Sequence, residues 1–587
     1  MNNSASTENA KGSHTGAPRS LSIAMLGSGG SGVMTAGQQL LDAAGQAGWY
    51  GMMTRSSGPQ IRGGEAAALL RLSPQPVETH KGRFDILLAI DWLNADRFVG
   101  EIILDSDSLV IGDVGGTVPE AISAMGGRYV ELPLGELAKG IQGGRPNMVA
   151  LGALSQLIGI PEEALEKVLT RSLSRKGQEA IDASMAGVRA GMTQAAELPG
   201  IEKIDVTANP DRERWSITGN EAAGMGAIRG GVRFVAAYPI TPATEILEWL
   251  APNLKKVGGA LVQAEDELAS VNQLIGGSFG GTPSLTATSG PGLALMTESI
   301  GLAVASETPI VVVDVMRGGP STGIPTKSEQ TDLNIALYGL HGDAPHVVVA
   351  PMSIGDCLFT TQWGTHLAET LQTASIVLSD QSLGQTRALI DRPADIAFVS
   401  GGRQITSKAE NFQRYVVNDS GVSPMSVPGT PGCQYTADGL EHTPTGTPSS
   451  RAEDHIQQLN KRKRKLDQFD YGDHWALTEG EGEVAVLTWG SSTGPVSEAI
   501  AMLEAEGMKV RLVSMRLLLP AQPERLAAAL AGVKRTLVVE QCHGAQFYHY
   551  LRAHYDLPCE LRSMAVPGPL MIRPDDVISE LKAWENA

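Results

Sequence analysis

Short apolar runs alternate with segments of helical periodicity along most of the chain. The runs have the length of strands and are nearly continuous, as a parallel sheet covered by helices on both faces requires. The clearest are LSIAML at 21–26, FDILLAI at 84–90, SLVIGDV at 108–114, RFVAAYP at 233–239, PIVVVDVMR at 309–317 and EVAVLTWGS at 483–491. The pattern predicts an α/β protein, and 587 residues are enough for three or more domains.

Changes in composition divide the chain into three α/β units. A polar stretch, ELPGIEKIDVTANPDRERW, follows the first unit, and a segment rich in Pro, Gly, Ser and Thr follows the second. We expect a disordered tail at 1–20, a first unit at 21–197, a linker at 198–215, a second unit at 216–400, a connecting segment at 401–480 and a third unit at 481–587. The second unit is predicted to be a doubly wound parallel sheet, because its strands are apolar throughout and have helices between them.

The balance of charge limits the classes of partner. Against 46 Lys and Arg stand 64 Asp and Glu, a formal net charge of -18, so we expect neither nucleic-acid nor membrane binding. No apolar stretch approaches the ~20 residues of a membrane span, and we expect a cytoplasmic protein. The basic run KRKRK at 461–465 is predicted to form the solvated face of a helix.

The cysteines and histidines do not predict a metal site in this chain. His549 and His554 are five positions apart, whereas residues three or four apart share a helical face. The cysteines are too widely spaced for a disulfide framework or an iron–sulfur cluster. They are Cys357, Cys433, Cys542 and Cys559.

A glycine turn follows the first predicted strand. Gly27-Ser28-Gly29-Gly30-Ser31-Gly32 has the spacing of a dinucleotide-binding turn, in which backbone N–H groups receive a phosphate. The acidic residue that would hold the ribose of NAD is missing, since the matching place reads GMMTRSSGPQIRGG, with Arg55 and Arg62 and no carboxylate until Glu65. The turn therefore indicates either a phosphate-bearing ligand other than NAD or a tight packing turn.

Polar and glycine-rich residues follow four successive strands of the second unit. Each group has an ordinary structural explanation: Thr241-Pro242 suits a helix N-cap and first position, and the acids at 265–267 suit a helix dipole. Together they predict one pocket at the carboxyl edge of the sheet, where open parallel sheets bind ligands. The four groups are Tyr238-Pro239-Ile240-Thr241-Pro242, Gln263–Glu267, Thr288-Ser289-Gly290-Pro291-Gly292 and Arg317-Gly318-Gly319-Pro320.

These motifs resemble those of a known enzyme family. YPITP, QAEDE, TATSGPG and VMRGGPSTGIPT, in this order, resemble the pyrimidine-binding domain of the thiamine-dependent 2-oxoacid:ferredoxin oxidoreductases. GSGGSG and SSGPQIRGGEA in the first unit resemble the family's gamma-type domain, here fused ahead of the alpha-type region. The third unit is similar to the transketolase C-terminal domain.

The resemblance implies a role for each residue of the predicted pocket. Glu267 would bind the aminopyrimidine ring of thiamine diphosphate and activate it, with Pro239, Ile240, Ser289 and Gly290 lining the cofactor. Thr241 would direct its hydroxyl at the bound 2-oxoacid, and Arg317 would hold the substrate carboxylate. The candidates for binding coenzyme A (CoA) are Gly27, Ser28, Gly29, Gly32 and Arg62.

The resemblance also implies a missing half of the active site. Thiamine enzymes hold the diphosphate and its Mg²⁺ with a GDG motif, and no GDG occurs in this chain. We expect a separate beta subunit to supply the diphosphate site, the Mg²⁺ and a [4Fe-4S] cluster that passes electrons to ferredoxin. The family suggests an assembly of two alpha-beta pairs, a heterotetramer.

The fusion of gamma-type and alpha-type regions is similar to that of the 2-oxoglutarate enzymes, with pyruvate or branched-chain 2-oxoacids as alternative substrates. The expected reaction gives succinyl-CoA, CO₂ and reduced ferredoxin. Two alternatives come from other classes of protein: a nicotinamide-dependent dehydrogenase, which the missing ribose carboxylate disfavours, and a non-catalytic scaffold subunit. Retention of Thr241, Glu267 and Arg317 speaks against the scaffold.

Overall fold

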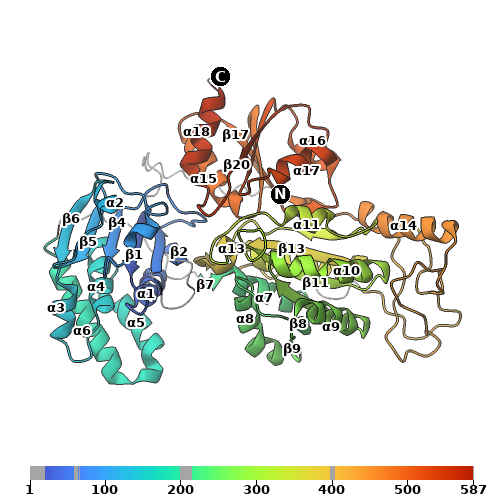
Figure 1. The fold of residues 1–587 in the computed structure, drawn as a ribbon, viewed down its shortest axis with the longest axis horizontal. Coiled ribbons are helices and arrows are strands. Elements are labelled where there is room, and N and C mark those ends of the chain that lie inside the picture. The colour runs from blue at the N-terminus through green and yellow to red at the C-terminus, as the bar shows by residue number, and fades with distance from the viewer. Residues whose placement is uncertain (1–19, 58–63, 65, 199–213, 397–402, 586–587) are drawn as a thin grey trace, which may run out of the picture.

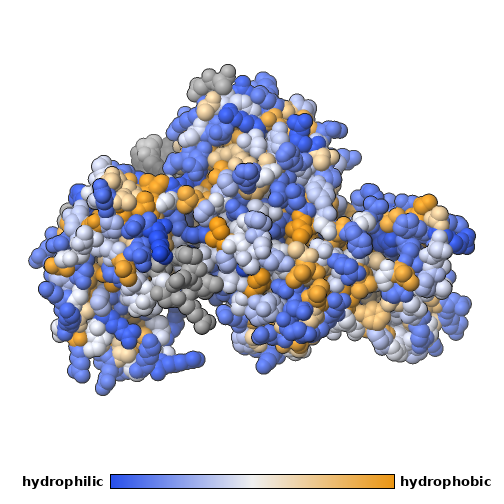
Figure 2. Space-filling view, in the orientation of Figure 1, coloured by the Kyte–Doolittle hydropathy of each residue, from blue (hydrophilic) through white to orange (hydrophobic). Residues whose placement is uncertain are grey.

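The computed structural model describes residues 20–57, 64, 66–198, 214–396 and 403–585, which form three sheets with helices packed on them (Figure 1). In Figure 1 the first unit, in blue, lies beside the second, in green and yellow, and the third, in orange and red, lies above them. The prediction of three α/β units is confirmed. One face of the molecule is largely hydrophilic with scattered apolar patches (Figure 2).

The first sheet is mixed. Its order is β6 (Arg128–Leu132), β5 (Leu109–Asp113), β4 (Ile86–Ala89), β1 (Leu21–Gly27), β3 (Ala66–Ser73), β2 (Tyr50–Ser57), β14 (Arg387–Asp391) and β7 (Arg214–Thr218). The first four are parallel, and antiparallel pairing begins between β1 and β3. One face packs on α1 (Val33–Gln46), α3 (Leu134–Lys139), α4 (Pro146–Ile158), α5 (Glu162–Leu173) and α6 (Gln178–Ala195), and the other on η1 (Ala95–Phe98) and α2 (Glu120–Ser123).

The first sheet extends past the predicted end of the first unit. β7 and β14 come from the part of the chain that leads into and out of the second unit, yet β14 pairs with β2, and β7 pairs with β14. The hydroxyl of Tyr50 on β2 also donates to the Asp391 carboxylate on β14 at 2.9 Å. Pairing covers the exposed edge that β2 would otherwise present. The two units are therefore joined by a continuous sheet.

The second sheet is doubly wound, as predicted. Its order is β18 (Leu517–Leu519), β12 (Val347–Val349), β13 (Ala374–Asp380), β11 (Ile310–Met316), β10 (Ser284–Thr288), β8 (Phe234–Ala237) and β9 (Ala260–Gln263), all parallel except β18. One helical layer contains α7 (Gly219–Arg229), α8 (Thr244–Leu254) and α12 (Asp356–Leu371), and the other contains α9 (Glu267–Phe279), α10 (Gly290–Ala305) and α11 (Leu333–Tyr338). The short α13 (Gln381–Gln385) follows β13.

The third sheet shares a core with the second unit. Its order is β15 (Ala476–Glu479), β17 (Val510–Met515), β16 (Val484–Trp489), β19 (Arg535–Glu540) and β20 (Glu560–Ala565). α15 (Thr493–Ala505) and α18 (Pro574–Glu585) pack on one face. Residues of the other face and of α16 (Pro523–Ala529) and α17 (Gln546–His554) belong to the core of the second sheet. Four further 3₁₀ turns are η2 (Ser174–Lys176), η3 (Lys255–Val257), η4 (Gly472–Trp475) and η5 (Gly490–Ser492).

The basic run does not form a solvated face, so that prediction is wrong. It lies on α14 (Ala452–Asp467), where Lys461, Arg462 and Lys465 are buried. Lys461 and Lys465 are one helical turn apart, and both ammonium groups bind the buried carboxylate of Glu307, at 2.5 and 2.9 Å. The helix therefore fastens the connecting segment to the second unit.

Candidate functional site

The second sheet brings the predicted pocket residues to one edge. β11, β10, β8 and β9 are parallel neighbours, so the loops that follow them emerge side by side. A direct contact joins the loops after β11 and β8, because Arg317 Nη1 donates to the backbone oxygen of Thr241 at 2.5 Å. Thr241 and Arg317 are therefore neighbours in space, 76 positions apart in sequence.

Thr241 does not cap a helix, contrary to the ordinary structural explanation of Thr241-Pro242. α8 begins at Thr244, and its first turn has no side-chain cap. The loop is held from behind by Asn220, whose Nδ2 donates to the Pro242 carbonyl at 2.8 Å. Ile240 packs against the core of the sheet. The side chain of Thr241 is therefore not needed to start the helix.

Glu267 is buried at the start of α9, with 7% of its surface exposed. Its neighbour Asp266 is the N-cap and accepts from the Ala269 amide at 2.7 Å, so Glu267 is not used for capping. A Cβ on Gly292 would lie 2.8 Å from Glu267 Cγ and 2.0 Å from Thr288 Oγ1. Only glycine lets the carboxyl approach the start of α10 this closely.

The start of α10 is a cradle of small residues. Ser289 is the N-cap residue, and its hydroxyl is buried without a partner among the described residues. A Cβ on Gly290 would lie 2.6 Å from both carboxylate oxygens of Asp332. An unsatisfied buried hydroxyl beside two required glycines is typical of a place where a ligand group completes the hydrogen bonding.

Arg317 is influenced by the charge of two carboxyl groups that the sequence reasoning missed. Asp314 on β11 has no exposed surface, and Asp332, a half-buried residue whose Oδ2 is buried, is the N-cap residue of α11. Burial and the neighbouring Asp332 raise the pKa of Asp314 well above its usual value. Burial also raises the pKa of Asp332, to about 6, although Arg317 acts in the opposite direction. An aspartate inside the apolar run VVVDV was the signal that could have indicated this pair.

The glycine turn of the first unit has a carboxylate against it. The backbone N–H of Ser28 donates to Asp91 Oδ2 at 2.9 Å, and its hydroxyl donates to the same oxygen at 2.8 Å. Gly32 has φ of 85°, and a Cβ there would lie 2.4 Å from Asn147 Nδ2. Asp91 thus takes donors that a phosphate would use, and Arg62 lies outside the described residues.

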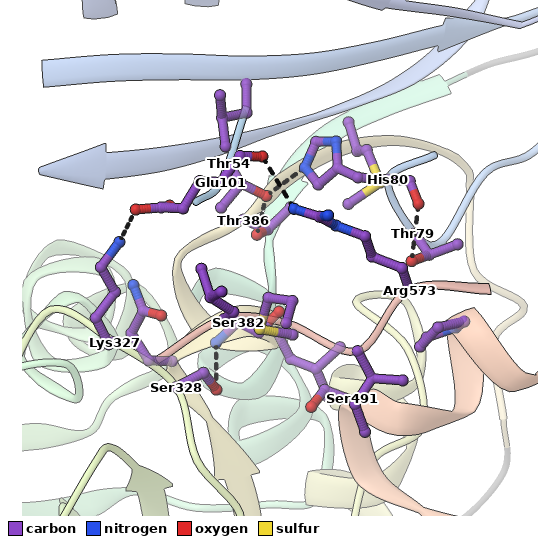
Figure 3. A pocket seen from close by; sticks show the side chains of 18 of the residues that line it. Thr54, Thr79, His80, Glu101, Lys327, Ser328, Ser382, Thr386, Ser491 and Arg573 are labelled. Carbon is purple, nitrogen blue, oxygen red and sulfur yellow. Dashed lines mark hydrogen bonds and ion pairs between the residues drawn. The ribbon is translucent and has the colours of Figure 1, made fainter. Parts of the chain in front are cut away.

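A cavity of about 100 Å³ lies where the three units meet (Figure 3). In Figure 3, His80 and Thr386 both point toward Thr54, and His80 Nε2 is 2.8 Å from Thr54 Oγ1. Burial lowers the pKa of His80 to about 3. The cavity adjoins the Arg317 loop, because Lys327 is among its lining residues and its carbonyl accepts from the Gly318 amide at 3.0 Å. No part of the glycine turn at 27–32 lines it.

Models of protein families match three parts of the chain. Residues 225–461 match the thiamine diphosphate-binding domain of pyruvate flavodoxin/ferredoxin oxidoreductase, and residues 22–194 match pyruvate ferredoxin/flavodoxin oxidoreductase. Residues 473–568 match the transketolase C-terminal domain. All the predicted cofactor and catalytic residues of the second unit lie within the first of these matches.

Curated relatives extend the match over most of the chain. The alpha subunit of 2-oxoacid:ferredoxin oxidoreductase 2 from Aeropyrum pernix is 31% identical over 76% of this chain and 74% of the relative. The 2-oxoglutarate synthase subunit KorA from Methanothermobacter marburgensis is 33% identical over 63% of this chain and 98% of the relative. The chain is an alpha subunit of the 2-oxoacid:ferredoxin oxidoreductase family. The predicted family and fold class are confirmed.

A solved structure of a 2-oxoacid:ferredoxin oxidoreductase matches nearly the whole alpha subunit described here. It is the 2-oxoglutarate:ferredoxin oxidoreductase from Magnetococcus marinus with 2-oxoglutarate, coenzyme A and succinyl-CoA bound. The TM-score is 0.88 at 36% identity, over 96% of this chain and 99% of that one.

Over the described ranges, no helix of the alpha subunit is long and apolar enough to cross a membrane, and no group of three metal-ligating side chains occurs.

Proposed function

We propose that this alpha subunit belongs to a 2-oxoglutarate:ferredoxin oxidoreductase, which converts 2-oxoglutarate and CoA to succinyl-CoA and CO₂ and passes the electrons to ferredoxin. The observation that carries the proposal is the match over nearly full length to the Magnetococcus marinus enzyme, whose structure holds 2-oxoglutarate, CoA and succinyl-CoA. The assembly of Thr241, Glu267, Ser289 and Arg317 at one sheet edge supports it independently.

The residues at this edge fit the pyrimidine end of thiamine diphosphate. Glu267 is buried beside the glycine-rich start of α10, and Ser289 offers a buried hydroxyl without a partner. When bound, thiamine diphosphate supplies the carbon nucleophile and the electron sink for decarboxylation of a 2-oxoacid. Glu267 would donate or accept the proton at the pyrimidine nitrogen, and Pro239, Ile240 and Gly290 would shape the walls.

Arg317 and Thr241 would position the substrate. The planar guanidinium can hold a carboxylate with two parallel hydrogen bonds. Its Nη1 is bonded to the Thr241 backbone, so its orientation is tied to the loop that carries the Thr241 hydroxyl. Both groups can therefore act on one bound 2-oxoacid, Arg317 at the carboxylate and Thr241 at the keto oxygen.

CoA must reach the same edge. The cavity between the units has the cationic side chains of Lys81, Lys327 and Arg573 in its lining, beside the carboxylates of Glu78 and Glu101, and its volume of about 100 Å³ would admit only one end of a long ligand with phosphates. The candidates Gly27, Ser28, Gly29, Gly32 and Arg62 remain a proposal for the phosphates. For the Ser28 amide to bind a phosphate, Asp91 would first have to move away.

We also propose that activity requires a beta subunit carrying the diphosphate site, Mg²⁺ and a [4Fe-4S] cluster, assembled as two alpha-beta pairs. The chain has no GDG motif for the diphosphate. Apolar side chains are exposed close to the candidate site, on the loop after β8, on β9 and on the helices that follow: Tyr238, Val262, Leu268 and Leu295. Exposed apolar groups at a functional edge are typical of a surface that a partner covers.

The test is co-expression with the beta subunit and assay of viologen reduction with 2-oxoglutarate, pyruvate and 2-oxoisovalerate, with and without CoA. We expect the highest kcat/KM with 2-oxoglutarate, dependence on CoA, and no activity from the alpha subunit alone. Preference for pyruvate or 2-oxoisovalerate would contradict the assigned substrate, and turnover by the isolated chain would contradict the need for a partner.

A substitution tests the role of Glu267. Glu267→Gln keeps the shape of the side chain but removes its proton exchange, and we expect the rate to fall by about 100-fold or more. Glu298→Gln, an exposed carboxylate on the neighbouring helix α10, is the matched control and should keep wild-type rates. Normal turnover by Glu267→Gln would refute the assignment.

A further inference from the structure

Asp314 and Asp332 form a buried carboxyl pair behind Arg317. Both carboxylate oxygens of Asp314 are buried without a donor among the described residues, as is Oδ2 of Asp332, and the Asp332 side chain lies near enough to share a proton with Asp314. Asp332 in turn lies against the start of α10, 2.6 Å from the position of a Cβ on Gly290. The pair thus lies between the candidate substrate arginine and the candidate cofactor cradle.

The segment that carries Asp332 is held by the third unit. The Gln330 amide donates to the Gln541 carbonyl at 2.8 Å, and the Gln541 amide donates to Gln330 Oε1 at 2.7 Å. Gln546 Nε2 donates to the Thr331 carbonyl at 2.9 Å. Because these bonds fix the backbone at residues 330 and 331, immediately before Asp332, they restrict movement of Asp332 away from Asp314.

Two adjacent buried carboxyl groups do not both ionise near neutral pH. The charged groups that act on the pair are Arg317, which favours ionisation, and Glu329, which opposes it at Asp332. The pair therefore holds two protons below a pH of about 6 and one proton above it. With one proton it carries a single negative charge opposite the single positive charge of Arg317.

We propose, on the basis of the function proposed above, that Asp314 and Asp332 are positioning residues for Arg317 and limit the positive charge that it presents to the 2-oxoacid carboxylate. The physical reason lies in the decarboxylation step. As the C–C bond breaks, its electron pair stays on the former keto carbon and neutral CO₂ leaves, so the carboxylate loses its charge. A full positive charge at this carboxylate would stabilise the bound substrate more than the transition state. Partial neutralisation of Arg317 reduces that difference.

The proposal predicts a separation of KM from kcat. The experiment uses complexes of the beta subunit with wild-type chain, Asp314→Asn, Asp332→Asn, the double variant, and Asp343→Asn as an exposed control of equal charge change. In the double variant no carboxylate offsets the charge of Arg317, and we expect KM for 2-oxoglutarate and kcat both to fall by about tenfold. A tenfold change corresponds to ~1.4 kcal/mol, the size of one charge contact. A purely structural role would raise KM or leave it unchanged.

The pH profile is the second readout. For wild type and Asp343→Asn, KM should fall as the pH decreases through about 6, because the pair becomes neutral. The double variant should lose this step, since no carboxyl of the pair remains to titrate. A double variant that keeps the wild-type step would overturn the proposal.

A measurement that needs no turnover separates this inference from the proposed function. In infrared spectra of the full-length chain at pH 7, the C=O absorption of protonated carboxyl groups should be weaker in the double variant than in wild type, and unchanged in Asp343→Asn. A wild-type complex inactive with every 2-oxoacid would refute the function and leave this difference in place. Equal absorption in wild type and the double variant would overturn the carboxyl pair even if the enzyme is active.

Discussion

The buried ion cluster around Glu307 offers a direct test of how the connecting segment is held. Glu307 has no exposed surface, and its carboxylate binds the ammonium groups of Lys461 and Lys465. Its backbone oxygen accepts from Arg414 Nη2 at 2.8 Å. Both lysines and Arg414 belong to the segment that follows the second unit, so one residue just after α10 holds that segment through its carboxylate and its backbone oxygen.

Glu307→Gln removes the charge but keeps the volume. Coulomb's law at an effective dielectric constant of ~20 gives about 6 kcal/mol for each contact at such distances. Much of this is offset because Lys461 keeps a bond to Ser423 Oγ and Lys465 keeps one to the Gln372 carbonyl, each at 2.8 Å. Leaving two buried ammonium groups without a counter-charge should still lower the free energy of unfolding by about 3–5 kcal/mol.

The assay is urea unfolding, with limited proteolysis to show whether cleavage appears first between residues 403 and 470. Lys463→Met is the matched control, because Lys463 pairs with Asp467 on the same helix but is 69% exposed; it should cost less than ~1 kcal/mol. A triple replacement of Glu307, Lys461 and Lys465 by Met should recover much of the loss. If Glu307→Gln were no less stable than Lys463→Met, the cluster would not hold the segment.

The same cluster fixes the sign of a pH effect. The two lysines and Arg414 hold the pKa of Glu307 far below its ordinary value of 4.5 despite its burial. The folded chain then stays ionised at a pH where the unfolded chain binds a proton. The stabilisation is complete above pH 4.5 and decreases as the pH falls below it, whereas Glu307→Gln should lack this part of the acid sensitivity.

Two further predictions concern the site and the cavity. Gly292→Ala places a methyl group 2.0 Å from Thr288 Oγ1 and 2.8 Å from Glu267 Cγ, so we expect activity to fall by about 100-fold because Glu267 is displaced. The control is Gly276→Ala on α9, where a Cβ meets nothing within 4 Å; it should raise stability by about 1 kcal/mol in thermal melts. Equal activity of the two variants would contradict the role of Gly292 in seating Glu267. Burial lowers the pKa of His80 from 6.5 to about 3, so its ring stays neutral in the folded chain and stability is lost as the pH falls from 6.5 towards 3. His80→Asn should reduce this loss by about 1–3 kcal/mol, measured by urea unfolding at pH 7 and at pH 4.5. Unchanged pH dependence in the variant would show that the ring of His80 is hydrated in the folded chain.

The edge that carries the candidate site could be predicted from sequence because the carboxyl end of each strand is marked locally, by the end of its apolar run. Each apolar run ends in a polar group, and in a doubly wound sheet all such groups emerge on the same side. The prediction for Thr241 and Arg317 therefore led to an actual contact. The assigned chemical roles of these residues stay predictions, as do the unit boundaries, since β7 and β14 cross from the second unit into the first sheet.

The prediction for the basic run was wrong for a physical reason that local sequence does not contain. Charge and periodicity at 461–465 favour a solvated helix, and only a carboxylate 154 positions earlier makes burial of Lys461 favourable. Asp91 at the glycine turn is a similar case, since it lies 63 positions from Ser28. Pairs of this kind depend on tertiary packing, which no window of sequence describes.

The third unit contributes to the candidate site without lending it a reactive group. Gln330 is fully buried, and its side chain binds the Trp489 carbonyl at 2.9 Å, the Ser492 hydroxyl at 2.8 Å and the Gln541 amide at 2.7 Å. These partners belong to the loops that follow β16 and β19, at the carboxyl edge of the third sheet. Two residues beyond Gln330, Asp332 lies against Gly290 and faces Asp314. Because a buried carboxyl pair persists only where the backbone cannot separate it, the third sheet holds the charge environment of Arg317 in place, and the fusion of the three units keeps that geometry within a single chain.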